Sequence, residues 1–217
     1  MKKSLIYAIM CATFVLSAGE AEYVRQELAA GGDIQHFRIN ANLPEQFNRK
    51  PLEAGSVKFD CDEKNLYFTI TMADNDLVSE AENDQSPLRN LGDAIQIFLK
   101  SEKDTYIWEF QVDSQAHRSY FFHQGPGRIF YPNEATGTPA FSVENTITDG
   151  QWITKITIPL SIFKEKGFDF TDAENWTFLI VRHNFSRFND AKETSSYPQV
   201  VGNMYNPARF GRLILKR

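Results

Sequence analysis

Polar side chains with paired hydrogen-bonding groups recur along the strands predicted for the middle and end of the chain. Amide, carboxylate and guanidinium groups each present neighbouring donors or acceptors, which match adjacent hydroxyl groups on a polyol. On the predicted strands these residues are Gln96, Glu109, Gln111, Arg182 and Asn184. Tyr197 follows in the next predicted loop, and its ring offers a flat apolar surface. The pattern predicts a polar binding surface with Tyr197 as its stacking platform.

A second group of side chains is typical of calcium sites. Calcium prefers several oxygen ligands, often carboxylates from short loops. Aspartates of this kind stand at predicted strand ends, namely Asp60, Asp62, Asp74, Asp76 and Asp93. They do not follow the spacing of an EF-hand, and aspartates at strand ends also form turns with their own backbone. Calcium ligands and turn formers therefore remain two open interpretations.

The sequence carries no recognisable catalytic motif. It has no Gly-x-Ser-x-Gly nucleophile elbow and no zinc-binding spacing. The four histidines are scattered along the chain, at His36, His117, His123 and His183. His183 shares the alternation of Leu179 and Val181, which predicts a hydrogen-bonded core histidine. We therefore expect a binding protein rather than an enzyme.

Short strands, in which apolar and polar residues alternate, must position these side chains. Leu66, Phe68, Ile70 and Met72 share one face of a strand, and polar residues share the other. Trp108, Trp152 and Trp176 are expected in the core. Asp149-Gly150 predicts a two-residue hairpin turn, and residues 159–166, followed by a glycine, form the one plausible short helix. About ten such strands predict an all-β, antiparallel β-sandwich or jelly roll.

Length and charge limit the possible partners. The 217 residues suit one large β domain, and the formal net charge is -5 with a pI near 5.4. No basic stripe runs along the chain, which argues against a nucleic-acid partner.

The first residues have the pattern of a secretory signal peptide. Lys2 and Lys3 precede a short apolar stretch at residues 5–16, and small residues follow at positions 17–19. This stretch is too short for a transmembrane helix. The prediction is a signal peptide over residues 1–21, a leader over 22–33 and one domain over 34–217, in a protein exported to the periplasm or the extracellular space.

The order of several motifs resembles the family 9 carbohydrate-binding modules over residues 34–217. The motifs are residues 56–60, 66–68, 74–76, 92–99, 109–113, 152–160 and 209–213. The resemblance implies a β-sandwich related to DOMON-type domains, a carbohydrate ligand, and structural calcium in some members. It also implies a non-catalytic role in polysaccharide catabolism, at most as an accessory module to glycoside hydrolases.

The sequence departs from the family at its sugar clamp. The family places one tryptophan just before the signature strand, where this chain has Leu88-Arg89-Asn90-Leu91, and a second where it has Ser196-Tyr197. The signature glutamate is Gln96 here. Arg89 and Tyr197 therefore join the residues expected to bind the ligand.

Two other functions remain open. Related sandwich domains hold haem for electron transfer, and Met72, Met204, His117 and His183 are conceivable axial ligands. The chain is alternatively an exported structural or protein-interaction module, whose protein partners the sequence does not identify.

Overall fold

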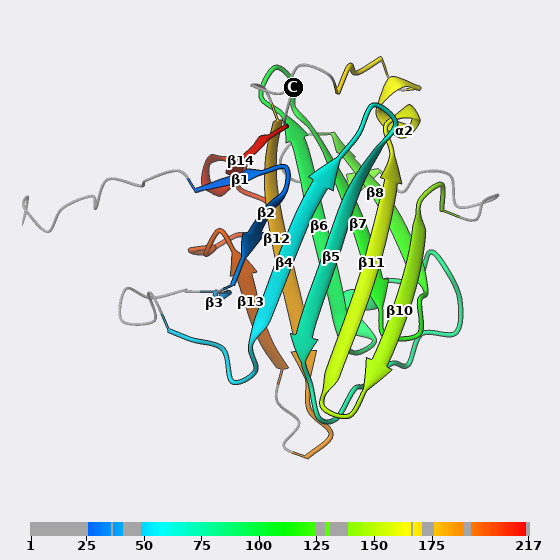
Figure 1. Ribbon diagram of the computed structural model, residues 1–217, viewed down its shortest axis with the longest axis vertical. Coiled ribbons are helices and arrows are strands. Elements are labelled where there is room, and N and C mark those ends of the chain that lie inside the picture. The colour runs from blue at the N-terminus through cyan, green and yellow to red at the C-terminus, as the bar shows by residue number, and fades with distance from the viewer. Residues whose placement is uncertain are drawn as a thin grey trace, which may run out of the picture.

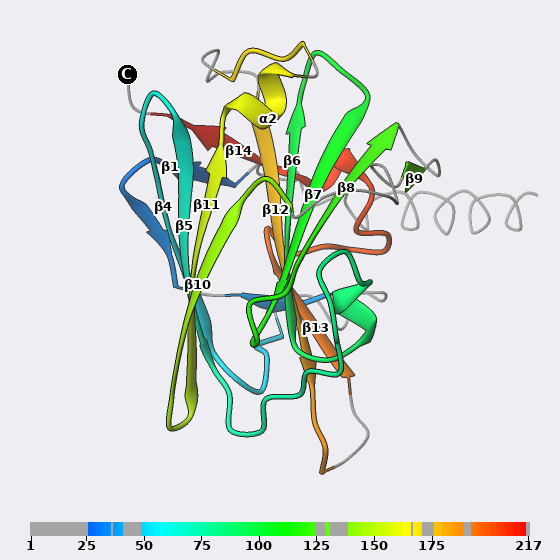
Figure 2. The same cartoon turned by 90° about the vertical axis from the view of Figure 1, so that its right-hand side faces the viewer.

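The computed structural model describes residues 26–35, 37–40, 49–124, 129–130, 139–165, 167–170, 176–188 and 192–215. They fold into two β-sheets that face one another across a shared core (Figure 1; Figure 2). This architecture confirms the predicted all-β sandwich. No helix in the described parts of the chain is long and apolar enough to cross a membrane.

The larger sheet has nine strands. They are β1 (Glu27–Ala29), β3 (Arg38–Ile39), β6 (Ala94–Ser101), β7 (Tyr106–Asp113), β8 (Arg118–Gln124), β9 (Ile129–Phe130), β12 (Trp176–Phe185), β13 (Lys192–Tyr197) and β14 (Gly211–Ile214). The strands β12, β6, β7 and β8 lie side by side and are antiparallel. The short pair β1–β14 is parallel, which the sequence did not predict.

The smaller sheet has five strands in the order β10-β11-β5-β4-β2. They are β10 (Ser142–Thr148), β11 (Gln151–Pro159), β5 (Asn65–Ala73), β4 (Gly55–Cys61) and β2 (Gly32–Ile34). The helix α2 (Ser161–Lys164) follows β11, within the predicted range. Asp149-Gly150 forms the β10–β11 turn, where Gly150 has a φ of +72°, as its turn requires.

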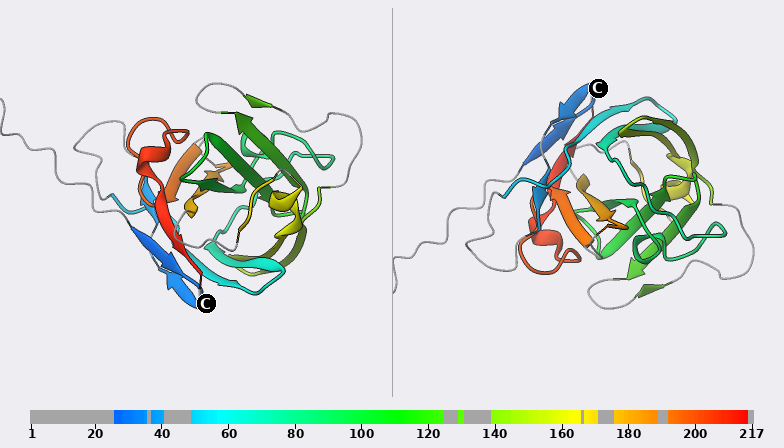
Figure 3. Two further views of the ribbon diagram at one scale, coloured as in Figure 1. Left: turned by 90° about the horizontal axis from the view of Figure 1, so that it is seen from above. Right: turned by 90° about the horizontal axis from the view of Figure 1, so that it is seen from below.

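The domain begins earlier than residue 34. Strand β1 pairs with β14 in one sheet, and β2 pairs with β4 in the other, so the expected leader contributes to both. Figure 3 shows these first strands beside β14. Backbone pairing at sheet edges makes few demands on side chains, so no side-chain pattern predicts it. The surplus over about ten strands consists of β1, β2 and β9, which have two or three residues each, and of the six-residue strand β13. The predicted loop position of Tyr197 is therefore wrong, since Tyr197 is the last residue of β13.

Alternating side chains build the core between the sheets. In β5 the burial pattern alternates at every residue, and Leu66, Phe68, Ile70 and Met72 are at most 1% exposed. The indole rings of the three tryptophans are likewise in the core, as predicted: Trp108, Trp152 and Trp176.

Strands β6, β7 and β12 are buried on both faces, which distinguishes them from β5. A second apolar cluster covers the outer face of the nine-stranded sheet. Its members are Phe98, Ile107, Leu179, Val181, Val200 and Phe210, with Met204 and Tyr205 packed against them. The chain after β13 therefore folds back over this face. Polar side chains on the same face consequently become buried too.

Substitution of Gly92 tests whether the close backbone contact before β6 contributes to stability. Gly92 has a φ of +134°, and a Cβ there would lie 2.2 Å from the carbonyl oxygen of Val78. We expect Gly92→Ala to lower the free energy of unfolding by more than about 2 kcal/mol, because both the backbone and the contact are strained. Gly202→Ala is the control, since Gly202 has a φ of +79° with no described atom within 4 Å. It should cost about 1 kcal/mol. Urea unfolding of both variants measures this, and equal losses would contradict it.

Candidate functional site

A buried polar cluster lies on the outer face of the nine-stranded sheet. Ile95 and Ile97 point into the core, so Gln96 between them points outward. In the neighbouring strand β7, Gln111 lies opposite Gln96, and Glu109 shares its face. Gln96, Glu109 and Gln111 are at most 1% exposed. The structure thus brings together three of the predicted binding residues.

Glu109 is the centre of this cluster. Its Oε1 accepts hydrogen bonds from the side-chain amides of Gln96, at 2.5 Å, and Gln111. Its Oε2 lies 2.6 Å from Nε2 of His123 on β8. A buried carboxylate needs such donors, because burial without them costs several kcal/mol. The cluster is therefore a connected network, which we call the Glu109 cluster: Gln96, Glu109, Gln111, His123 and His183.

His183 extends the network onto β12. Its Nε2 lies 2.5 Å from Oε1 of Gln96, and Thr194 lies 3.4 Å from its Nδ1. Burial, together with the positive charges of Lys192 and Arg89, lowers the pKa of His183 to about 3. The imidazole is therefore neutral near pH 7. Because the amide nitrogen of Gln96 donates to Glu109, its oxygen is left to accept from the Nε2–H of His183. The predicted hydrogen-bonded histidine is confirmed.

Arg89 and Tyr205 form the rim of the Glu109 cluster. Arg89 belongs to the 3-10 turn η2 (Leu88–Asn90), its backbone N–H donates to Oε1 of Gln111, and its Nη1 lies 3.8 Å from Oε1 of Glu109. The same Nη1 donates to the hydroxyl of Tyr205. The Tyr205 ring meets Phe98 edge-on at 5.5 Å. Burial raises the pKa of Tyr205 to about 12, so its hydroxyl stays protonated.

Sequence reasoning missed Tyr205 and His123. Tyr205 lies between β13 and η4 (Pro207–Arg209), outside any strand, so alternation could not assign it to a face. His123 ends a run of aromatic residues whose alternation was ambiguous. Phe121, two residues before His123 in β8, lies opposite Glu109 and is 7% exposed.

Tyr197, Arg182 and Asn184 do not belong to this cluster, which corrects the predicted single surface. Arg182 pairs in register with Ile95, and Tyr197 pairs with Ile180, so both side chains face the other sheet. The Tyr197 ring stacks on Phe178 at 6.1 Å. Alternation is correct within each strand, but only the register between strands shows that Val181, and not Arg182, shares the face of Gln96.

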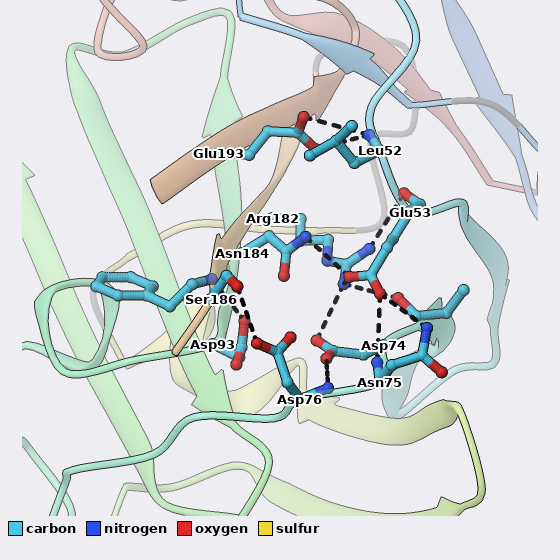
Figure 4. Close-up of polar contacts among 12 residues, drawn as sticks. Leu52, Glu53, Asp74, Asn75, Asp76, Asp93, Arg182, Asn184, Ser186 and Glu193 are labelled. Atoms are coloured by element: carbon cyan, nitrogen blue, oxygen red, sulfur yellow. Dashed lines mark hydrogen bonds and ion pairs between the residues drawn. The ribbon is translucent and has the colours of Figure 1, made fainter. Parts of the chain in front are cut away.

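Arg182 instead ties the two sheets together at one end of the sandwich (Figure 4). Its Nη2 lies 3.1 Å from Oδ2 of Asp74 and 3.2 Å from Oε2 of Glu53. It also donates to the carbonyl oxygen of Ala73 at 2.8 Å. The Nδ2 of Asn184 donates to the same Glu53 at 2.9 Å. Arg182, Glu53 and Asp74 thus form an ion-pair network at this end of the sandwich.

The five aspartates predicted as calcium ligands lie in two places. Asp60 and Asp62 are at the β4–β5 turn, where Asp62 accepts from two backbone N–H groups and from the hydroxyl of Tyr67. Asp74, Asp76 and Asp93 lie near Arg182 at the opposite end (Figure 4). Because the length of β5 separates these two places, the five aspartates cannot all coordinate one calcium ion.

The aspartates near Arg182 are already engaged. Asp93 accepts from the N–H groups of Val78 and Phe185, and burial raises its pKa to about 7. Asp76 accepts from Ser186 and from a backbone N–H. Within the described part of the chain, no three Asp, Glu, His or Cys side chains are grouped to hold a metal ion. These contacts join segments that are far apart in the sequence, so Asp76 and Asp93 connect loops rather than form only local turns. Calcium binding stays a prediction.

The conceivable haem ligands point in different directions. Met72 is fully buried between the sheets, whereas His183 faces outward. His117 is held by Asp113, with Nδ1 2.9 Å from Oδ2. Met72 and His183 therefore do not form an axial pair. Met204 packs on the outer face, where Nε2 of His183 is already bonded to Gln96.

A recess on the five-stranded sheet is a weaker candidate for the site. It is lined by Gly31, Gly32, Asp33, Lys58, Phe59, Asp60, Tyr67 and Thr69. Its charged walls are exposed to solvent, and the hydroxyl of Tyr67 is held by Asp62 at 2.8 Å. The Glu109 cluster is the better candidate, because its polar groups are buried and bonded to one another.

Comparison with solved structures identifies the fold. A proposed carbohydrate-binding protein from Bacteroides uniformis matches with a TM-score of 0.69 at 12% identity, over 89% of this chain and 100% of that one. A family 9 carbohydrate-binding module from Caldicellulosiruptor kristjanssonii matches in complex with glucose and with cellotriose. Its TM-scores are 0.59 and 0.58 at 15% identity, over 89% of this chain and 96% and 94% of those chains.

No protein-family model and no curated protein matches the chain. The structural matches show that it has the fold of family 9 carbohydrate-binding modules, as the order of motifs in the sequence predicted.

The neutral state of His183 predicts acid sensitivity. Its folded pKa lies below the unfolded value of 6.5, so the folded state binds fewer protons. This contribution to stability is complete above pH 6.5 and is lost as the pH falls toward 3, by at most about 1.4 kcal/mol per pH unit. Urea unfolding at pH 7 and pH 5 should show a larger loss for the wild type than for His183→Gln, which retains a donor but does not titrate. Equal losses would mean that His183 does not carry the effect.

The position of Arg182 predicts a structural role. We expect Arg182→Met to lower the free energy of unfolding by about 3–5 kcal/mol, because Asp74 would be left as a buried, unpaired carboxylate. Arg212→Met is the control: Arg212 is 45% exposed and 3.6 Å from Glu27, and its loss should cost less than about 1 kcal/mol. Thermal and urea unfolding compare the two, and a similar small loss in both variants would refute the structural role.

Proposed function

We propose that this protein is a non-catalytic carbohydrate-binding domain that holds a sugar at the Glu109 cluster. The supporting observation is a row of amide, carboxylate and imidazole groups buried on the outer face of a sheet. Such groups are costly to bury and add nothing to the core between the sheets, so a ligand gives the best reason for them. The shared fold with family 9 carbohydrate-binding modules supports the same proposal.

The chemistry of the cluster suits sugar hydroxyls. A hydroxyl both donates and accepts, so it can insert between an amide of Gln96 or Gln111 and the carboxylate of Glu109 without leaving either unpaired. The ring of Tyr205 offers an apolar face for the C–H groups of the sugar. Entry requires the rim to open, and Arg89, 29% exposed at its side chain, is the accessible part of that rim.

We also propose where the protein acts. The charged and apolar pattern of residues 1–21 supports export to the periplasm or the extracellular space. An exported sugar-binding domain without catalytic groups suits polysaccharide catabolism, alone or beside a glycoside hydrolase.

Glycan binding by variants of the cluster tests the proposed function. The wild-type protein is screened on a glycan array, and the best glycan is titrated by calorimetry alongside glucose and cellotriose. We expect Tyr205→Ala and Gln96→Leu each to weaken binding about tenfold or more, because each removes a stacking or hydrogen-bonding group. Tyr197→Phe should bind as the wild type does, because Tyr197 lies on the inner face.

Two outcomes would contradict the proposal. One is an array without any bound glycan. The other is a bound glycan whose affinity is unchanged in both cluster variants while circular dichroism shows that they are folded.

A further inference from the structure

Two cations meet at the rim of the Glu109 cluster. Lys192, at the start of β13, donates from Nζ to the carbonyl oxygen of Arg89 at 2.7 Å and lies 4.7 Å from the Phe185 ring centre. Arg89 belongs to the turn η2, 103 residues earlier in the chain. The fold therefore places two positive side chains at one edge of the proposed sugar site.

These two cations lack sufficient negative partners. Among the described residues, Lys192 forms no ion pair with a carboxylate. Within the described part of the chain, the one carboxylate paired with Arg89 is Glu109, whose Oε1 is 3.8 Å away, beyond hydrogen-bond distance, and already accepts from two amides. Asp113, the other carboxylate that β6 and β7 place on this face, is held by Ser79 and His117. Counted over the residues that the structure describes, the rim thus carries excess positive charge.

The electrostatics of the neighbouring groups agree with this geometry. Burial lowers the pKa of Lys192, and the positive charge of Arg89 lowers it further. An anion between the two side chains would relieve this repulsion and would satisfy the remaining N–H donors of both. Carboxylates form charge-assisted hydrogen bonds with such groups, which are about twice as strong as neutral ones.

We infer that the ligand is an acidic sugar, a uronic acid, whose carboxylate lies between Arg89 and Lys192 while its hydroxyls meet Gln96, Glu109 and Gln111. This inference rests on the proposed function and names the substrate class of the same site. The polar row recognises hydroxyl groups, and the two cations select the charged ring over the neutral one.

Matched sugar pairs test the inference. D-Glucuronate is compared with D-glucose and D-galacturonate with D-galactose, as monosaccharides and as short oligomers, by calorimetry and ligand-observed NMR. Each pair differs only at C6. We expect the acidic member of at least one pair to bind about fivefold or more tightly in 20 mM salt. The advantage should shrink in 500 mM salt, because screening weakens a partly exposed charge pair.

Variants that remove one positive charge test whether Lys192 and Arg89 bind the carboxylate. Lys192→Met and Arg89→Gln should each remove most of the advantage of the acidic sugar. Lys155→Met is the matched control, since Lys155 is exposed on strand β11 of the other sheet, and it should keep the full advantage. Using two variants keeps the test valid if one of them does not fold.

The outcomes separate the two proposals. Neutral members that bind as well as acidic ones, or an advantage that survives in both folded rim variants, would overturn the acidic-sugar inference and leave the proposed function intact. Glucose 6-sulfate binding more tightly than glucuronate would overturn the carboxylate assignment. If no sugar of any class binds, the proposed function itself fails, and the inference fails with it.

Discussion

A carboxylate buried on the outer face of a β-sheet constrains the rest of this structure. Glu109 is 1% exposed, so its charge must be balanced by donors that are themselves fixed in place. Gln96 and Gln111 supply two amides, and His123 supplies an imidazole. Each donor comes from β6, β7 or β8, so the antiparallel register of these strands sets the geometry of the cluster. The segment after β13 then covers it with Tyr205 and Phe210.

The two faces of the nine-stranded sheet therefore lie in different environments. In β6, Ile95 and Ile97 pack into the core between the sheets, while Gln96 and Phe98 face the outer cluster. Adjacent positions thus contribute to different properties, one to stability and the next to the proposed site. The same division separates Arg182, which ties the sheets together, from its neighbour His183, which joins the polar network. A substitution shifted by one residue changes which property is affected.

The fold could be predicted because period-two alternation, the Asp149-Gly150 turn and the order of motifs all indicate the same architecture. The row Gln96, Glu109 and Gln111 could be predicted from alternation within two strands. The assignment of Arg182 and Tyr197 failed because alternation gives two faces without saying which face of one strand continues that of the next. That relation is set by register, with Val181 opposite Gln96.

Other features could not be predicted from alternation. Tyr205 lies in an irregular segment, where no periodicity fixes the direction of a side chain. Arg89 was expected at the site from the family resemblance, but Lys192 was not, because the two residues are 103 positions apart and meet only through the fold. The strands β1 and β2 join the sheets through backbone hydrogen bonds, which many sequences can make.

Residue-resolved NMR can show whether a glycan binds at the Glu109 cluster. Isotope-labelled protein is titrated with the best-binding glycan, and shifts are followed in backbone amides and in the side-chain amides of Gln96 and Gln111. We expect the largest shifts on these side chains and on β7, β8 and residues 203–206, on the outer face of the nine-stranded sheet. Shifts confined to the recess around Tyr67, or to the inner face around Tyr197 and Arg182, would contradict it.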